Sequence, residues 1–203
     1  MSISAEDRQR ISGAIRAAES KTSGEIVCVL AESSATATAL PIFLAAIGGL
    51  ALPWLLVGFT AMPVYRILSL QIVAFVILTG LFCWPPVGVA LMPRRTRRAV
   101  AHRVAMEQFR SRGLAGKSGG AGVLIFVSLA ERYARIIVGD EMSARVPKAQ
   151  WQVAVDALIA HMRDGRIADG FVAAIDLCGN ELAKHYPRTG ASRNELPDRI
   201  YLI

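Results

Sequence analysis

The sequence predicts a small α/β domain that is interrupted by a transmembrane hairpin of two helices. Between residues 39 and 92 the chain carries a single charged residue, Arg66, whereas the rest holds 22 of the 23 basic and all 16 acidic residues. Outside this block, segments with helical periodicity alternate with short apolar runs that are typical of buried strands. Removing residues 39–92 leaves about 149 residues, enough for one domain with its own core but not comfortably for two. The domain is therefore expected in two parts, residues 1–38 and 93–203, with the hairpin between them.

Two apolar segments, residues 41–62 and 67–91, form the predicted hairpin. Each is uncharged and exceeds the roughly 20 residues that a helix needs to cross a hydrocarbon core about 30 Å thick. Only residues 63–66 separate them, so the turn is tight and both outer ends return to one side. The pair Gly48-Gly49 and Gly58 are either suited to close packing between the two helices or simply tolerated there. The alternative is a hairpin buried in a soluble core, which the remaining residues are too few to cover on every side.

Basic residues flank the hairpin unevenly. The turn carries Arg66 alone, whereas a cluster of arginines follows the second segment: Arg94, Arg95, Arg97, Arg98 and Arg103. Because basic residues near membrane ends stay cytoplasmic, both termini and the whole domain are expected in the cytoplasm. The same arginines are candidates for binding anionic lipid head groups, at about 1 kcal/mol each. No nucleic-acid partner is expected, since the cluster abuts a membrane segment and lacks interleaved aromatic residues.

The order of the remaining predicted elements is helix, strand, helix, strand, strand, helix, helix. The first helix begins at Ser4-Ala5-Glu6-Asp7, which resembles a capping box, and Pro147 opens the third helix of this series. The first two strands are expected to be parallel, joined by a right-handed crossover that the hairpin interrupts. The last two strands form an antiparallel pair that turns at Glu131-Arg132. The tail, residues 192–203, ends in apolar residues and is expected to dock on the domain. The predicted strands are residues 25–31, 123–129 and 133–138.

Cysteine and histidine residues form no recognisable catalytic or metal-binding pattern. The three cysteines lack metal-type spacing and are expected to be small buried apolar residues: Cys28, Cys83 and Cys178. The three histidines fall on separate predicted helices, without a nucleophile at an interpretable spacing, so surface or boundary positions are expected: His102, His161 and His185.

A short motif, Gly116-Lys117-Ser118, resembles the end of a phosphate-binding loop. The full pattern requires a glycine five residues before Gly116, where this chain has Ser111. The context is also reversed, because this segment leads from a helix into a strand. We therefore interpret the motif as a flexible turn and not as a nucleotide site.

Acidic residues gather near the predicted strand ends. Asp140 and Glu141 follow the third strand, Glu25 begins the first, and Glu131 lies in the hairpin turn. Carboxylates are the ligands that Ca²⁺ and Mg²⁺ prefer, usually several converging with carbonyl oxygens. Two adjacent acids in an extended loop point in different directions, so solvated acids are the favoured interpretation. Asp140 with Glu141 remains the candidate if a metal site exists.

Several short motifs resemble the TPM domain family. They are the start Thr22-Ser-Gly-Glu-Ile-Val-Cys-Val29, the strand pair around residues 120–127 and 135–139, and the step Asp164-Gly-Arg…Gly170. The resemblance implies a small three-layer α/β/α sandwich, of a kind found in thylakoid lumen proteins of photosystem repair and in bacterial membrane-associated proteins. Some members of the family are described as acid phosphatases or as calcium binders. A second glycine usually follows the first in the loop after the third strand, and here Gly139 is followed by Asp140-Glu141-Met142.

These observations favour a membrane-anchored, TPM-like module at the bacterial inner membrane that acts as an interaction or accessory protein without catalysis. The expected partners are membrane lipids and either a membrane protein or a second copy of the chain. The alternative implied by the resemblance is a weak metal-dependent phosphohydrolase or a calcium-binding domain, with Ca²⁺ or Mg²⁺ as cofactor. Phosphatase chemistry needs phosphate-clamping cations, for which Arg135 or Arg145 are the candidates, and the catalytic residues are unknown.

Overall fold

The computed structural model describes residues 3–34, 39–60, 62–84, 92–114, 121–188 and 196–203. The chain divides into two compact units. One unit combines residues 1–34 with 100–203, and the other contains residues 35–99. We refer to them as the α/β unit and the hairpin unit.

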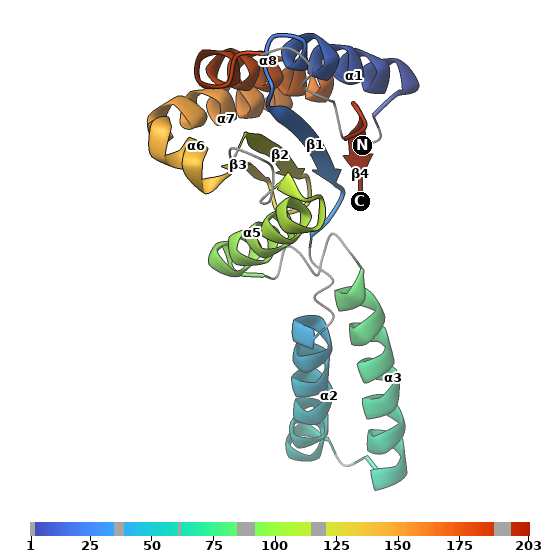
Figure 1. Cartoon of the computed structure of the whole chain (residues 1–203). Coiled ribbons are helices and arrows are strands. Elements are labelled where there is room, and N and C mark those ends of the chain that lie inside the picture. The colour runs from blue at the N-terminus through green and yellow to red at the C-terminus, as the bar shows by residue number, and fades with distance from the viewer. Residues whose placement is uncertain (1–2, 35–38, 61, 85–91, 115–120, 189–195) are drawn as a thin grey trace. The chain divides into compact units, whose positions relative to one another are not determined.

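The α/β unit is built on a four-stranded sheet with the strand order β3-β2-β1-β4 (Figure 1). Strand β1 (Glu25–Ala31) pairs in parallel with β2 (Gly122–Ser128), which pairs antiparallel with β3 (Tyr133–Val138). Both pairings confirm the predicted topology. Every residue of β1 and β2 is buried, as expected for continuous apolar runs covered on both faces.

The tail docks on the domain as expected, and it does so as a strand. Strand β4 (Ile200–Leu202) pairs in parallel with β1, with Cys28 opposite Ile200. The pairing continues where Ile203 N–H donates to the Leu30 carbonyl at 3.1 Å. The sequence analysis missed this strand because three residues are too few to show a periodic pattern.

Three long helices cover one face of the sheet: α1 (Ala5–Glu19), α7 (Lys148–Arg163) and α8 (Ile167–His185) (Figure 1). The larger core lies between them and the sheet and includes Ile11, Ile125 and Phe171. Pro147 is the residue before α7, close to the predicted start. Asp7 N–H donates to the Ser4 Oγ at 3.0 Å, so Ser4 caps α1 as its motif predicts.

The opposite face of the sheet packs against α5 (Arg94–Ser111), whose residues from Val100 onward belong to the α/β unit. Ala105 and Phe109 of α5 meet Leu124 and Phe126 of β2 in a second, smaller core. Helices, sheet and helix therefore form three layers, which confirms the fold class expected from the family resemblance. Cys28 and Cys178 are buried, as expected, whereas the Cys83 side chain lies outside the described part of the chain.

In the hairpin unit, α2 (Ala39–Phe59) packs against α3 (Val64–Cys83). A Cβ atom on Gly48 would lie 3.0 Å from Leu78, and one on Gly49 would lie 3.3 Å from Phe75, so this pair serves close packing and is not merely tolerated. Gly58 meets nothing within 4 Å among the described residues. Its small size is therefore not needed for the packing of α2 on α3.

Both helices of the hairpin unit are long and apolar enough to cross a membrane. Many of their large apolar side chains are exposed, among them Trp54 at 84 % and Phe59 at 86 %. The helix of a soluble core buries such side chains, so the exposure speaks against the alternative of a hairpin inside a soluble core. Helix α3 begins at Val64, which places Arg66 in its first turn and not in the connecting turn.

Candidate functional site

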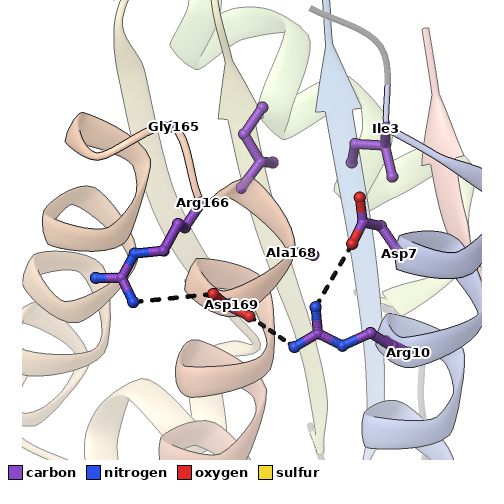
Figure 2. Close-up of a pocket in the computed structure, with 8 residues that line it drawn as sticks. Ile3, Asp7, Arg10, Gly165, Arg166, Ala168 and Asp169 are labelled. Atoms are coloured by element: carbon purple, nitrogen blue, oxygen red, sulfur yellow. Dashed lines mark hydrogen bonds and ion pairs between the residues drawn. The ribbon is translucent and has the colours of Figure 1, made fainter.

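The described residues line a surface pocket of about 290 Å³ at the start of α8 (Figure 2). Helix α1 contributes Asp7 and Arg10 to it, Arg166 comes from the turn before α8, and Asp169 comes from the first turn of α8. The remaining lining residues are small or apolar: Ile3, Gly165, Ile167 and Ala168. The pocket therefore brings together charged groups that lie about 160 positions apart in the sequence.

The turn between α7 and α8 has the sequence Asp164-Gly165-Arg166, part of one motif that resembles the TPM family. Gly165 has φ +76°, a left-handed conformation in which glycine ends a helix without strain. Its N–H donates to the Met162 carbonyl at 3.1 Å. Gly170 allows close packing of α8 on α7, because a Cβ there would lie 2.9 Å from the Leu158 carbonyl oxygen. The two glycines thus fix the corner that presents Arg166 to the pocket.

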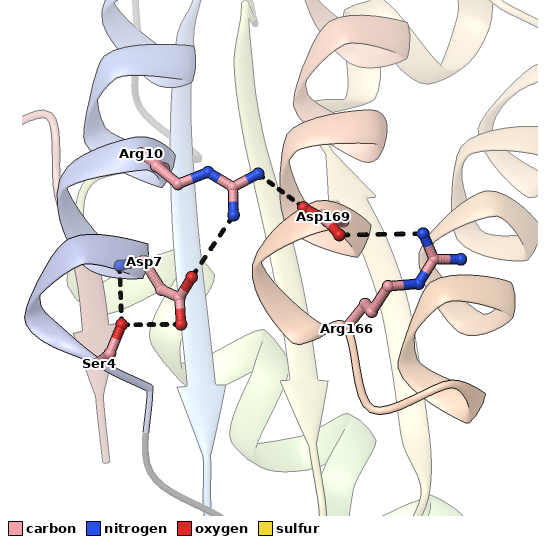
Figure 3. Close-up of polar contacts among 5 residues, drawn as sticks. All are labelled: Ser4, Asp7, Arg10, Arg166 and Asp169. Atoms are coloured by element: carbon pink, nitrogen blue, oxygen red, sulfur yellow. Dashed lines mark hydrogen bonds and ion pairs between the residues drawn. The ribbon is translucent and has the colours of Figure 1, made fainter.

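The charged side chains of the pocket are bonded to one another (Figure 3). Asp169 accepts a hydrogen bond from Arg10 at 2.6 Å and lies 3.9 Å from Arg166. Arg10 also pairs with Asp7 at 3.5 Å, and Arg166 pairs with Asp164 at 3.0 Å. The hydrogen bond from Arg10 lowers the pKa of Asp169, so this carboxylate stays ionised. This alternation of charges ties α1 to α8 and leaves the pocket close to neutral.

A buried carboxylate, Glu131, lies at the carboxyl ends of β1 and β2 and is only 5 % exposed. It accepts hydrogen bonds from Ser33 Oγ at 3.1 Å, from the Ser34 N–H at 3.1 Å to each oxygen, and from Ser128 Oγ. Burial acts to raise the pKa of Glu131, but these hydrogen bonds outweigh it and hold the pKa below its ordinary value. The group fixes the chain at Ser34, the last residue of the first part of the α/β unit.

A second partly buried carboxyl, Glu19, lies at the end of α1. It accepts a hydrogen bond from the Ile26 N–H at 2.8 Å. Burial, followed by a hydrogen bond and repulsion from Asp198 and the charge of Glu25, raises the pKa of Glu19 to about 8. Asp198 in turn pairs with Arg16 at 3.4 Å, just before β4. Glu19 is therefore protonated at neutral pH and helps to join α1 to the segment that carries β4.

The acidic residues considered as a candidate metal site, Asp140 and Glu141 with Glu25 and Glu131, do not converge. Asp140 and Glu141 are exposed in the first turn of a short helix, α6 (Asp140–Arg145), so the expected extended loop was wrong. Acidic residues favour the first turn of a helix because of its dipole. Glu25 and Glu131 lie at opposite ends of the sheet, since Glu25 pairs with Gly122 at the start of β2 and Glu131 follows its end. Among the described residues, no three acidic, histidine or cysteine side chains gather as a metal site would require.

The five arginines after the hairpin differ in their contacts. Four are exposed: Arg94, Arg95, Arg98 and Arg103. Arg97 is half-buried, and its Nε donates to the Met92 carbonyl at 3.0 Å. The first four of the series along the chain belong to the hairpin unit, whereas Arg103 belongs to the α/β unit.

The other sequence candidates do not assemble a site. The motif Gly116-Lys117-Ser118 lies outside the described residues. Arg135 on β3 is exposed, as is Arg145, whose guanidinium lies 5.2 Å from the Tyr186 ring centre. The three histidines are half-buried on α5, α7 and α8, which confirms the boundary positions expected for them. Sequence reasoning missed Arg10 and Asp169, because their partnership depends on the packing of α1 on α8.

Comparison with known proteins finds a family model that matches the second part of the chain. The model of the TPM domain matches residues 87–181, which include β2, β3, α6, α7 and most of α8. Residues 87–181 belong to a TPM domain. The TPM segment contains Arg166 and Asp169 of the pocket, whereas Asp7 and Arg10 come from the chain before it.

The fold of the TPM domain is also found in a solved structure. The NMR structure of the BA42 protein from the psychrophilic bacterium Bizionia argentinensis is similar to this chain, with a TM-score of 0.62. The likeness covers 100 % of this chain and 96 % of that one, at 19 % sequence identity. Identity this low shows a shared fold and no more. No curated protein matches the chain.

Proposed function

We propose that this chain is a membrane-anchored TPM module, held at the cytoplasmic face of a bacterial inner membrane and acting as an interaction or accessory protein. The observation that carries the anchoring is the pair α2 and α3: long apolar helices packed on each other with large apolar side chains facing outward. In water such a surface is unfavourable, whereas in a hydrocarbon core it is solvated by lipid.

The exposed arginines support the orientation. Arg94, Arg95 and Arg98 follow α3 and make no ion pair with any residue that the structure describes. They are therefore available to anionic lipid head groups, which contribute about 1 kcal/mol for each basic residue. Arg97 serves a different purpose, since its bond to the Met92 carbonyl holds the start of α5.

The bonded state of the pocket supports an accessory role over catalysis. A general base or nucleophile needs a group that is free to reach the substrate. Asp169 is occupied by Arg10 and lies beside Arg166, and Asp7 is occupied by Arg10 and Ser4. These bonds position the helices and direct the carboxylates at the two arginines of the pocket.

Membrane extraction tests the anchoring. Full-length protein is expected in the membrane fraction of bacterial cells and should resist washing with alkaline carbonate. Reporter fusions after residue 1, at residue 115 and after residue 203 should all report the cytoplasm. An external C-terminus would overturn the orientation, and release by carbonate would overturn the anchoring. Replacing Arg94, Arg95 and Arg98 with glutamine should lower the fraction of reporter fusions that report the cytoplasm. The same change at Arg163, far away in the sequence, should leave that fraction unchanged.

The role without catalysis is tested on purified protein with a phosphatase substrate and with Ca²⁺. We expect no hydrolysis above the level of a buffer control. A site of micromolar affinity would, in 5 mM Ca²⁺, stabilise the protein by about 5 kcal/mol. We expect the double variant Asp140→Ala, Glu141→Ala to respond to Ca²⁺ no differently from the wild type. A calcium-dependent stabilisation that this variant loses, or metal-dependent hydrolysis, would replace the proposal with the enzymatic or calcium-binding alternative.

A further inference from the structure

Strand β4 is an edge strand of the sheet, because the order β3-β2-β1-β4 places no described strand beyond it (Figure 1). Ile203, directly after β4, bonds to β1 twice: its N–H donates to the Leu30 carbonyl, and its carbonyl accepts from the Glu32 N–H. In a parallel pair, residues that bond the neighbouring strand alternate with residues that do not. Ile200 and Leu202 therefore direct their N–H and carbonyl groups toward the open edge, where a further strand can bond to them.

A second pocket, of about 370 Å³, lies at this strand. Arg8 and Ser12 of α1 line it together with Arg199 and the residues of β4. Leu202 is 49 % exposed although its side chain is large and apolar, and none of the described residues that line the pocket is acidic. The edge of β4 therefore combines outward main-chain groups with an apolar contact and positive charge.

The arginines near β4 are available to an anionic partner. Arg8 and Arg199 are exposed, and neither forms an ion pair with a residue that the structure describes. The Arg199 guanidinium lies 4.9 Å from the centre of the Tyr201 ring, and the Arg112 guanidinium lies 3.5 Å from it. Burial is the main cause that lowers the pKa of Arg112, and repulsion from Arg199 adds to this shift. Tyr201 thus holds two like charges near one another, an arrangement that attracts negative charge.

Both faces of the sheet offer a cation beside β4. Ile200 belongs to the larger core, on the face covered by α1, the helix that carries Arg8. Tyr201 packs against the smaller core on the opposite face, where Arg112 and Arg199 contact its ring. Side chains of an added strand alternate between the same two faces. Acidic residues on either face of that strand therefore meet an arginine.

We infer that the edge of β4 binds an extended, acidic segment of a partner protein, which adds to the four-stranded sheet as a further strand. Main-chain hydrogen bonds to Ile200 and Leu202 hold the segment, and its carboxylates pair with Arg8 on one face and with Arg199 on the other. The main chain supplies the contact, and the charges supply the choice of partner. The inference rests on the proposed interaction role, whose partner class it names, and is independent of the membrane anchoring.

Fluorescence anisotropy of a labelled peptide, Val-Glu-Glu-Val-Glu-Glu, measures binding to the full-length protein in micelles of an uncharged detergent. The wild type should give a saturable curve, and a peptide with glutamine in place of glutamate should bind more weakly. The double variant Arg8→Gln, Arg199→Gln should raise the dissociation constant on the order of tenfold, because charge pairs at the interface are lost. Arg135→Gln is the matched control: Arg135 is an exposed arginine on β3, the opposite edge strand, and its loss should leave the curve unchanged.

N-methylation of the peptide at every second residue tests the main-chain bonds. Of the two peptides made in this way, one should lose binding and the other should keep it, because only alternate N–H groups of an added strand face β4. Leu202→Pro removes an outward N–H from the protein and leaves the bonds of Ile203 to β1 in place. Since proline is accepted on edge strands, this variant should stay folded and bind the peptide more weakly.

Three results would show that the inference is wrong: no saturable binding to the wild type, equal binding of the glutamine peptide, or equal binding of both N-methylated peptides. A loss of binding in Arg135→Gln would place the peptide on β3 and contradict it as well. Self-association of the wild type that Leu202→Pro abolishes, measured by light scattering, would identify a second copy as the occupant instead. The proposed interaction role is overturned by metal-dependent hydrolysis and not by these results, so the two failures are distinguishable.

Discussion

At the scale of single residues, the surroundings of two carboxyl groups in the α/β unit shift their pKa values in opposite directions. Glu131 is surrounded by hydrogen-bond donors from Ser33, Ser34 and Ser128, which stabilise its charged form. Glu19 lies in a partly buried position close to Asp198, which disfavours its charged form. The first group joins β1 to the hairpin turn between β2 and β3, and the second joins α1 to the segment before β4.

Replacing Glu131 with glutamine is expected to destabilise the protein by about 1–3 kcal/mol at pH 7. The substitution turns one carboxylate oxygen into an NH₂ group, so a serine donor that bonded to that oxygen loses its acceptor. The folded-state pKa of Glu131 is lowered, so its stabilising effect is present above the unfolded pKa of about 4.3. That effect is lost as the pH falls through the folded pKa. The difference in melting temperature between wild type and Glu131→Gln should therefore shrink between pH 6 and pH 3. Glu107→Gln, at an exposed position on α5, should show no such difference at any pH.

Replacing Glu19 with glutamine is expected to stabilise the protein at alkaline pH. The raised pKa means that the stability linked to Glu19 is complete below the unfolded pKa of about 4.3 and falls as the pH rises to about 8. Glutamine mimics the protonated form and keeps an oxygen for the Ile26 N–H. Its advantage over the wild type should grow by on the order of 1 kcal/mol per pH unit across this range. If the difference in melting temperature between Glu19→Gln and the wild type is the same at pH 5 and at pH 8.5, the raised pKa of Glu19 is wrong.

At the scale of elements, the contact between α1 and α8 organises the pocket side of the α/β unit. A Cβ on Gly179 would lie 2.7 Å from the Cβ of Ala18, so the two helices approach closely where both residues are small. Near the other end of the same contact, Arg10 of α1 bonds to Asp169 of α8. The ion pair is exposed and contributes little by itself, whereas the close packing fixes the distance between the helices.

Gly179→Ala is expected to destabilise the protein by about 1–3 kcal/mol, because the added methyl group overlaps a rigid methyl group on the facing helix. Gly13→Ala on α1 is the matched control, since a Cβ there meets nothing within 4 Å among the described residues. It should stabilise α1 by about 0.5–1 kcal/mol through its helix propensity. Thermal unfolding in a mild detergent measures both. A neutral Gly179→Ala would show that α1 and α8 have room to separate.

At the scale of the whole molecule, the chain contains two compact units that are interleaved in sequence. The α/β unit has two cores of its own, one on each face of the sheet. The hairpin unit has the packing of α2 on α3 and an apolar outer surface. The surface of the α/β unit is therefore suited to water, and by our proposal the surface of the hairpin unit is suited to lipid.

Replacing residues 39–92 with a short Gly/Ser linker is expected to give a soluble, folded α/β protein. Packed helices lie roughly 8–10 Å apart, and a few residues at about 3.3 Å each bridge such a gap. The variant should unfold cooperatively and show dispersed NMR signals in the absence of detergent. A soluble aggregate without tertiary structure would show instead that the hairpin completes the core of the α/β unit.

Helices and strands could be predicted from the sequence wherever a segment was long and apolar. Residues of β1, β2 and β3, the two hairpin helices and the capped start of α1 follow from periodicity and capping, which are local properties. Predicted ends differ from the structure by a few residues, for example at α5, which begins at Arg94 and not near Arg97. The short α6 was missed, because six residues show too little periodicity, and the acids in its first turn were mistaken for a loop.

By itself, the sequence determined that this protein has an apolar hairpin inside an α/β domain, because burial and lipid solvation both select for residue type along the chain. The tertiary structure alone decided which polar groups meet when they are far apart in the sequence. Arg10 and Asp169 are 159 positions apart, and Ser34 and Glu131 are 97 positions apart. Such contacts depend on the packing of whole helices and strands, so no local pattern encodes them.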